Sequence, residues 1–438
     1  MAATMNFSLP QDLVDYLARI DAFIEKEIMP LQNENDNQRF FDHRREHSRT
    51  DWDNGGLPRQ EWEDLMHEAV RRADRAGLYR FSLPKEYGGD QPEGSNGRGA
   101  NLWMAVIREH LAAKGLGLFN DLQTEHSIVG NFPDVVMVRD FGSQEQKELL
   151  IGGRFRGETR ITFGLTEPRH GSDATWMETR AVPEMRDGVD GWRLDGAKKW
   201  QTGMHKATHC FIFARTGSKN GDTGGISCFI VPPTTPGFKI ESYEWTLNMP
   251  TDHATISLTN VWVPATSIIG PLHNGLAIAQ AFVHENRIRQ AASSLGAALY
   301  CINQSIAYAN ERKPFGQPLS HNQGIQFPLV ELATQCAMLR LLIRQTADKM
   351  DKLPSEHKIE KELGMEVSMC NYWANRLCCE AADRAIQVHG GNGYWRGNAF
   401  EHIWRHHRRY RITEGSEEIQ MRKVAAFMFG FGGRVSKL

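Results

Sequence analysis

The sequence lacks the features that mark several large classes of protein. Its seven cysteines are an odd number with no CxxC spacing, which argues against a disulfide framework or a metal site and favours a reducing compartment. The 51 Lys and Arg nearly balance the 53 Asp and Glu, so no bulk attraction to nucleic acid or an anionic membrane is expected. No apolar run approaches the length that spans a bilayer. We expect a globular protein with no nucleic-acid partner, no membrane span and no metal.

Targeting signals are absent at one end of the sequence and present at the other. The N-terminus has neither the apolar core of a signal peptide nor the Arg- and Ser-rich pattern of a transit peptide. The sequence ends in Ser436-Lys437-Leu438, the form of a receptor-read peroxisomal signal. Because Gly432 and Gly433 come shortly before it, we expect the signal to be accessible to a receptor. We therefore expect a peroxisomal protein that binds the peroxisomal import receptor.

The hydrophobic pattern divides the chain into three regions and a tail. Residues 1–160 show helical spacing, with Leu13, Leu17 and Ile20 among the apolar positions. Residues 161–272 consist of short β-rich runs separated by Gly, Asp, Asn and Pro. Residues 273–431 return to long apolar stripes of helical period, one of which runs from Ile288 to Ile306 and Ala309, and this indicates a helical bundle. Residues 432–438 form the tail with the peroxisomal signal. The predicted fold class is a multidomain α+β protein.

Three commonplace site motifs are missing: a GxGxxG after a strand, a P-loop and a serine nucleophile elbow. What remains is a set of polar and glycine-rich clusters at the junctions between predicted elements. "FGLTEPRHGSD" (163–173) and "GAKKWQTG" (196–203) follow or form strands, whereas "YANERKPFGQPLSHNQGIQ" (308–326) and "QVHGGNGYWRG" (387–397) interrupt the helical bundle. Taken singly, each has an ordinary structural explanation as a turn, a helix cap or a piece of core.

The last cluster, "RITEGSEEIQ" (411–420), places Glu414 directly before Gly415 and Ser416 at the start of a predicted helix. An acidic residue is favourable near a helix N-terminus, so ordinary capping explains this segment when it is considered alone. A catalytic carboxylate is the alternative interpretation.

In this order and at these separations, the clusters resemble the acyl-CoA dehydrogenase family over roughly residues 77–425. The resemblance also rests on "GLYRFSLPKEYGG", "FGSQEQKELLIGG", "ISLTNVWVP" and "NRIRQAASSLG". It implies an N-terminal all-α domain, a central β-barrel-like domain and a C-terminal four-helix bundle, with FAD bound between the central and C-terminal domains. It also implies a homo-oligomer, either a dimer or a dimer of dimers, that shares FAD across the subunit interface.

The resemblance assigns the cofactor-binding residues in two groups. Within one subunit, contacts to FAD are implied for Phe163, Leu165, Thr166, Ser172, Trp200, Thr202, Ser416 and Glu418, and Ser172 also lies near the CoA chain. From a neighbouring subunit, contacts to its adenosine and pyrophosphate are implied for Arg312, Phe315, Gln323, Gln387 and Gly391.

The reaction that the resemblance implies is FAD-dependent α,β-dehydrogenation of an acyl-CoA to the trans-2-enoyl-CoA. Glu414 is then the base that takes the α-proton, Arg287 contacts substrate or orients the base, and Gly415 leaves room for the acyl chain. Some relatives carry the base directly before the arginine that Arg287 matches. This chain has Asn286 there, and an amide cannot accept the proton; Glu285, one residue earlier, points about 100° away on a helix.

Two departures from the family pattern lie near the expected flavin and CoA sites, and an opening at the first of them, Arg169 and His170, would give dioxygen access to the flavin. Arg169 and His170 stand where small residues are usual, and Gln201 and Gly203 are uncommon beside Trp200. A peroxisomal enzyme would not meet the mitochondrial electron-transferring flavoprotein, so dioxygen is the second candidate acceptor. The alternative function is accordingly an acyl-CoA oxidase or a flavin monooxygenase on the same fold. A nucleic-acid-binding relative is indicated only by the basic run "RHHRRYR" (405–411).

Overall fold

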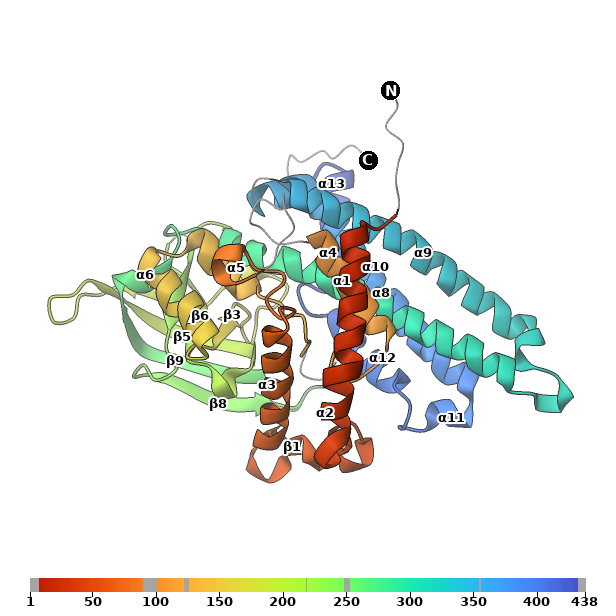
Figure 1. The fold of residues 1–438 in the computed structure, drawn as a ribbon. Coiled ribbons are helices and arrows are strands. Elements are labelled where there is room, and N and C mark those ends of the chain that lie inside the picture. The colour runs from red at the N-terminus through yellow and green to blue at the C-terminus, as the bar shows by residue number, and fades with distance from the viewer. Residues whose placement is uncertain are drawn as a thin grey trace.

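The computed structural model describes residues 8–89, 101–121, 126–217, 219–247, 253–353 and 356–431. Figure 1 shows a β-sheet at one side of the molecule, long helices that extend to the other side, and N-terminal helices in front of the junction. This mixed architecture confirms the predicted α+β class. The C-terminal signal residues Ser436, Lys437 and Leu438 lie outside the described residues.

The N-terminal region is helical, with one minor hairpin of β1 (Thr50–Asp51) and β2 (Leu57–Pro58). The first predicted stripe is confirmed, since Leu13, Ile20 and Ile28 are fully buried, although a π-helical turn at Ile24–Ile28 interrupts the regular helix. The α-helices of this region are α1 (Gln11–Phe23), α2 (Met29–Asn33), α3 (Gln60–Arg75), α4 (Asn101–Ala113), α5 (Pro133–Phe141), α6 (Gln144–Lys147) and α7 (Gly153–Arg156).

The central sheet has the strand order β10-β7-β6-β4-β5-β9-β8, and β3 pairs in parallel with β6. Alternate residues of β6 enter two different cores. Phe211 and Phe213 pack toward the helix α8 (Gly275–Glu311), whereas Cys210 and Ile212 pack toward the strands on the opposite face. The strands are β3 (Ile161–Gly164), β4 (Arg180–Pro183), β5 (Gly191–Thr202), β6 (His209–Arg215), β7 (Ile226–Val231), β8 (Phe238–Glu244), β9 (His253–Pro264) and β10 (Ile268–Ile269).

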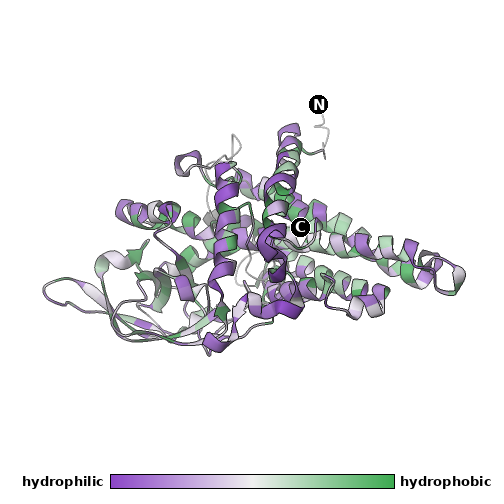
Figure 2. Ribbon diagram, turned by 60° about the horizontal axis from the view of Figure 1, so that its bottom comes forward, coloured by the Kyte–Doolittle hydropathy of each residue, from purple (hydrophilic) through white to green (hydrophobic). Residues whose placement is uncertain are grey.

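Long helices form the C-terminal region, and Figure 2 shows hydrophobic stretches along them. The predicted stripe from Ile288 onward is buried, but the inclusion of Ile306 was wrong because its side chain is 44% exposed. In the last turns of α8 the buried positions are Ile302, Ser305 and Ala309, so Ile306 falls beside the stripe. The helices are α8 (Gly275–Glu311), α9 (Gln323–Lys352), α10 (Glu356–His389), α11 (Gly391–Tyr394), α12 (Phe400–Tyr410) and α13 (Glu417–Met428).

The seven cysteines are all free and buried, as the apolar patterns around most of them predict. The basic run 405–411 belongs largely to α12, where His406, His407 and Tyr410 are buried and Arg405 pairs with Glu401 at 2.7 Å. This run is therefore part of the packed interior and its ion-paired edge. Among the described helices, none combines the length and apolar character that crossing a bilayer requires.

Candidate active site

Glu414 lies in the short connection between α12 and α13, in a left-handed backbone conformation with φ of 58°. The following Gly415 also has a positive φ, of 92°. Ser416 caps α13, because its side chain accepts a hydrogen bond from the backbone N–H of Ile419 at 3.4 Å. The capping interpretation of this segment is therefore correct for Ser416, and it leaves the position of Glu414 to be explained by other contacts.

Three donors hold the backbone carbonyl of Glu414. Arg287 on α8 donates through Nε at 3.0 Å and Nη2 at 2.7 Å, and Gln420 on α13 donates through Nε2 at 2.8 Å. A Cβ atom at Gly415 would lie 2.9 Å from Gln420 Nε2 and 3.2 Å from Arg287 Nη2, so glycine leaves the space that these donors need. The geometry thus matches the interpretation of Arg287 as the residue that orients Glu414. Its contact with substrate, and the space that Gly415 gives the acyl chain, stay predictions.

Burial raises the pKa of the Glu414 carboxyl, and the nearby charges of Arg287 and Arg409 offset this rise only in part. One oxygen of the carboxylate also accepts a hydrogen bond from Asn286 Nδ2 at 3.4 Å. A carboxyl with a raised pKa is a stronger base when ionised than a solvent-exposed one. Electrostatically, Glu414 is suited to proton transfer.

A chain of polar side chains leads from Glu414 into the protein, and we call it the amide relay. Asn286 Oδ1 accepts from Asn131 Nδ2 at 2.8 Å, and Asn131 Oδ1 in turn accepts from Arg289 Nη1. Arg289 is ion-paired with the fully buried Glu285 at 2.8 Å. The alternative base Glu285 is therefore paired with an arginine of its own helix. Sequence reasoning missed Asn131 and Arg289, because no local pattern links the loop before α5 to the first turns of α8.

A buried ion pair joins the two strand-end clusters. Lys198 on β5 lies 2.9 Å from Glu167, whose carboxylate also accepts from the backbone N–H groups of Glu178 and Thr179. Lys198 additionally donates to the carbonyl of Leu165 at 3.2 Å. Burial lowers the pKa of Lys198 to about 8 despite the carboxylate. This pair fixes the segment after β3 against β5, and the sequence analysis did not identify it.

Within the first group of predicted FAD residues, the structure brings the segment that follows β3 against the end of β5. The backbone N–H of Lys199 donates to the carbonyl of Thr166 at 3.0 Å, which places Thr166 beside Trp200. Trp200 lies at an irregularity of β5 with φ of 69°, and its indole is 49% exposed. Leu165 is half-buried near this junction, whereas Ser172 and Thr202 are exposed.

Phe163 lies deeper than the other members of the first group. Its ring stacks on Phe282 of α8 at a centroid distance of 4.4 Å. Asn286 follows Phe282 by one helical turn, so the end of β3 and Glu414 adjoin the same stretch of α8. Ser416 and Glu418 lie in the connection and first turn of α13 next to Glu414.

The second group lies at the opposite end of α8. Tyr308 near the end of α8 stacks on His389 at the end of α10, so the loop with Arg312, Phe315 and Gln323 lies near Gln387 and Gly391; all five are exposed. Arg287 and Glu311 are 24 residues apart in α8, which corresponds to about 36 Å along the helix axis. One chain therefore does not bring both groups around a single FAD molecule.

Both groups present an exposed aromatic ring on which a flat ligand can stack. Phe315 has φ of 54° and a fully exposed ring, and Trp200 likewise presents its indole to solvent. No atom would contact a Cβ at Gly390 or Gly391, so a ligand can approach this backbone closely. Exposed aromatic rings and open glycine backbone suit FAD, and contact of its adenosine and pyrophosphate with Arg312, Gln323, Gln387 and Gly391 stays a prediction.

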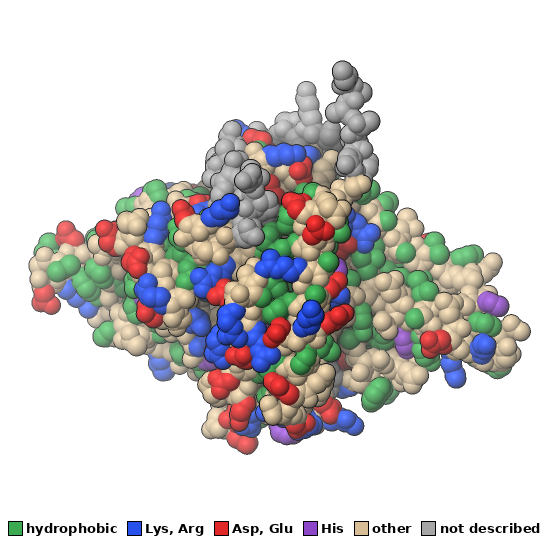
Figure 3. Space-filling model, viewed as in Figure 1, with side chains coloured by type: hydrophobic (Ala, Val, Ile, Leu, Met, Phe, Trp, Pro, Cys, Tyr) green, Lys and Arg blue, Asp and Glu red, His purple; other side chains and the backbone are tan. Residues whose placement is uncertain are grey.

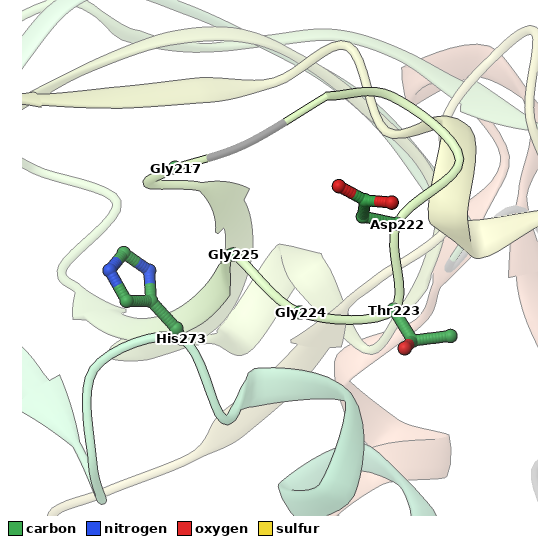
Figure 4. A pocket seen from close by; sticks show the side chains of 6 residues that line it. All are labelled: Gly217, Asp222, Thr223, Gly224, Gly225 and His273. Carbon is green, nitrogen blue, oxygen red and sulfur yellow. The ribbon is translucent and has the colours of Figure 1, made fainter.

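The cavity shown in Figure 4 is distinct from the candidate active site. It has a volume of about 390 Å³ and lies at the loop between β6 and β7. Its His273 is held by Thr216 at 2.9 Å and by the hydroxyl of Ser227, and its lining includes none of the predicted site residues. We assign no function to it.

Comparison with known proteins gives consistent matches. The sequence profile of the acyl-CoA dehydrogenase middle domain matches residues 162–261, and that of the C-terminal domain matches residues 273–429. The chain is 31% identical to a 3-(aryl)acrylate reductase of Clostridium sporogenes, over 96% of this chain and 99% of that protein. It is 30% identical to an acyl-CoA dehydrogenase of Bacillus subtilis, over 84% of this chain and 91% of that protein. Its structure is similar to that of butyryl-CoA dehydrogenase from Megasphaera elsdenii, with a TM-score of 0.74 and 25% sequence identity. The similarity covers 97% of this chain and 100% of that chain.

Proposed function

This chain belongs to the acyl-CoA dehydrogenase family of FAD-dependent oxidoreductases, and from that premise we propose that it converts an acyl-CoA thioester to the trans-2-enoyl-CoA with Glu414 as the base. The observation that carries the proposal is the position of Glu414. Its carboxyl has a raised pKa, and its backbone is fixed by three donors at the junction of α8 and α13.

The reaction removes one proton and one hydride from neighbouring carbons. Glu414 takes the α-proton, the electron pair of the broken Cα–H bond forms the Cα=Cβ double bond, and the β-hydrogen leaves with its electron pair. FAD, when bound, supplies N5 as the hydride acceptor. The α-proton of a thioester is weakly acidic, so a base with a raised pKa in a half-buried site is better suited than an exposed carboxylate. Arg287 and Gln420 contribute by holding Glu414 in one backbone conformation.

The test is the variant Glu414→Gln, which keeps the shape of the side chain and removes the basic oxygen. We expect it to retain FAD and to bind acyl-CoA, but to lose flavin reduction by several orders of magnitude in anaerobic stopped-flow measurements. Glu380→Gln on the exposed face of α10 is the matched control. Reduction of Glu414→Gln at the control rate would exclude Glu414 as the base and direct attention to Glu285.

We also propose that the protein acts as a homo-oligomer, a dimer or a dimer of dimers, in which two subunits share each FAD. The support is the separation of the two groups of FAD residues along α8. Exposed apolar side chains on α9 provide a surface for the partner subunit. Figure 3 shows hydrophobic side chains among uncharged ones and a few charged ones at the end of the molecule that α8 and α9 form. The exposed apolar side chains of α9 are Phe327, Val330, Met338 and Leu341.

The electron acceptor and the compartment form one further part of the proposal. Ser436-Lys437-Leu438 supports import by the peroxisomal receptor, and a fluorescent fusion that ends in these residues should enter peroxisomes whereas one ending in Ser436-Lys437-Ala should not. The acceptor is then dioxygen or an electron-transferring flavoprotein. The similarity to a reductase also supports testing the reverse reaction with a reduced acceptor, since the same groups serve both directions.

A further inference from the structure

Arg108 of α4 is a buried cation with few partners. Its side chain is more than nine-tenths buried, and its one hydrogen bond to a described residue runs from Nη2 to the carbonyl of Val129 at 3.1 Å. It makes no ion pair with any residue of the described segments. A buried guanidinium has five N–H donors and is normally paired with an anion, because its desolvation is otherwise unfavourable.

The groups around Arg108 do not supply that anion. The titratable neighbours that influence it are Arg289, Tyr410 and Tyr79, of which one is another cation and two are phenols. Burial, together with the nearby charge of Arg289, lowers the pKa of Arg108 to about 10. Arg289 differs, because it has Glu285 as its own partner.

Arg108 is linked to the candidate catalytic residues through the segment 129–131. The carbonyl of Val129 accepts from Arg108, and two residues later Asn131 accepts from Arg289 and donates to Asn286. Asn286 contacts the carboxylate of Glu414, which completes the amide relay. Tyr410 also lies within electrostatic reach of both Arg108 and Glu414. The segment 129–131 therefore joins the guanidinium of Arg108 to the amide relay that ends at Glu414.

We propose that Arg108 binds an anionic group at the far end of the acyl chain, so that the preferred substrates are acyl-CoA thioesters with a second acid group such as an ω-carboxylate. This inference rests on the proposed function, which places the α-carbon at Glu414 and lets the acyl chain extend away from it. A carboxylate can accept two parallel N–H bonds from a guanidinium, and other oxyanions share this chemistry. In the free protein the charge is retained at the expense of stability, as is common for binding residues.

The experiment compares pairs of thioesters that have the same chain length and differ only in a terminal methyl or carboxylate. Anaerobic flavin reduction gives kcat/KM for each with an artificial acceptor, and calorimetry gives the Kd. We expect wild-type protein to prefer the ω-carboxylated member at one or more chain lengths. Arg108→Met should lower this preference roughly ten- to hundred-fold, the range for a charged hydrogen-bond donor, while Arg108→Lys should retain part of it.

Thermal unfolding separates a binding role from a structural one. Removal of a buried unpaired charge should leave the Tm of Arg108→Met equal to or above that of wild type. Arg156→Met, on the exposed surface of α7, is the control for loss of an arginine. A methionine variant that folds less stably and keeps the wild-type substrate ratio would overturn the inference.

The two proposals fail in different ways. Wild-type protein that reduces its flavin equally with both members of every pair refutes the anion site alone. Protein that reduces its flavin with no thioester in either direction refutes the proposed function, and the anion site with it. An ω-sulfonate series in the same assay tests whether the site selects a carboxylate or any oxyanion.

Discussion

Replacement of Arg287 by glutamine should slow flavin reduction without removing substrate binding. A left-handed conformation costs a residue other than glycine about 1–2 kcal/mol, and Glu414 adopts one with φ of 58°. The hydrogen bonds from Arg287 to its carbonyl, measured at 3.0 and 2.7 Å, contribute about 1.5–3 kcal/mol because the donor is charged. The remaining bond from Gln420, worth about 0.5–1.5 kcal/mol, only balances the conformational cost.

Loss of the guanidinium should therefore allow Glu414 to leave its fixed position. The free energy involved corresponds to roughly a ten- to hundred-fold loss of the productive conformation and of the reduction rate. The Arg287 charge also lowers the pKa of Glu414, so the variant should have a still higher pKa. Because the ionised form is the base, its rate should begin to fall at a higher pH than in wild type as the solution is acidified.

Anaerobic stopped-flow reduction across a pH series measures both effects. Arg376→Gln is the matched control, since Arg376 contacts Glu417 at 3.3 Å in the same region but does not reach Glu414. An unchanged rate and pH profile in Arg287→Gln would refute the orienting role. A raised acyl-CoA Kd with an unchanged reduction rate would instead identify Arg287 as a substrate contact.

Three further results are expected. Arg312→Ala should lose FAD and dissociate together, as seen by absorbance and analytical ultracentrifugation, whereas Lys313→Ala should do neither; a monomer with full FAD content would contradict the shared site. Burial raises the pKa of Asp351 from 3.8 to about 7, so the folded protein favours the protonated carboxyl, and the stability that this gives is lost as the pH rises through 7. Asp351→Asn should therefore raise the Tm more at pH 8 than at pH 5. An equal change in Tm at the two pH values would refute the raised pKa. Finally, enzyme and its best acyl-CoA in air should release hydrogen peroxide if dioxygen is the acceptor, and reduced flavin that persists for minutes would exclude that route.

Some of this organisation could be predicted from the sequence because the responsible patterns are local. Amphipathic periodicity located the helices, and the order of the strand-end and glycine clusters identified Glu414 as a candidate base. The regular stripe also led to the error at Ile306, because a period of 3.6 residues does not specify where one face gives way to the next.

The remainder depends on contacts between distant parts of the chain. Asn131 lies 155 residues before Asn286, and Arg108 lies 21 residues before its acceptor Val129. Neither separation in the sequence produces a periodic pattern from which the contact could be predicted. The ion pair of Lys198 and Glu167 similarly requires knowledge of which strands are neighbours. Side-chain chemistry was visible in the sequence, whereas the partner of each polar group emerged only with the tertiary structure.

The seven buried thiols can report local unfolding of the protein, because each becomes reactive only when it is exposed. Cys210 and Cys228 lie in the central sheet, and Cys370, Cys378 and Cys379 lie in α10. Burial raises the pKa of each of these thiols, so a labelling reagent reacts only after the surrounding segment has separated from its neighbours. Mass spectrometry of pulse-labelled protein can therefore time the exposure of the sheet and of the bundle separately. If the two cysteine sets become labelled at different rates, and added FAD protects both, the cofactor links two units that otherwise open independently.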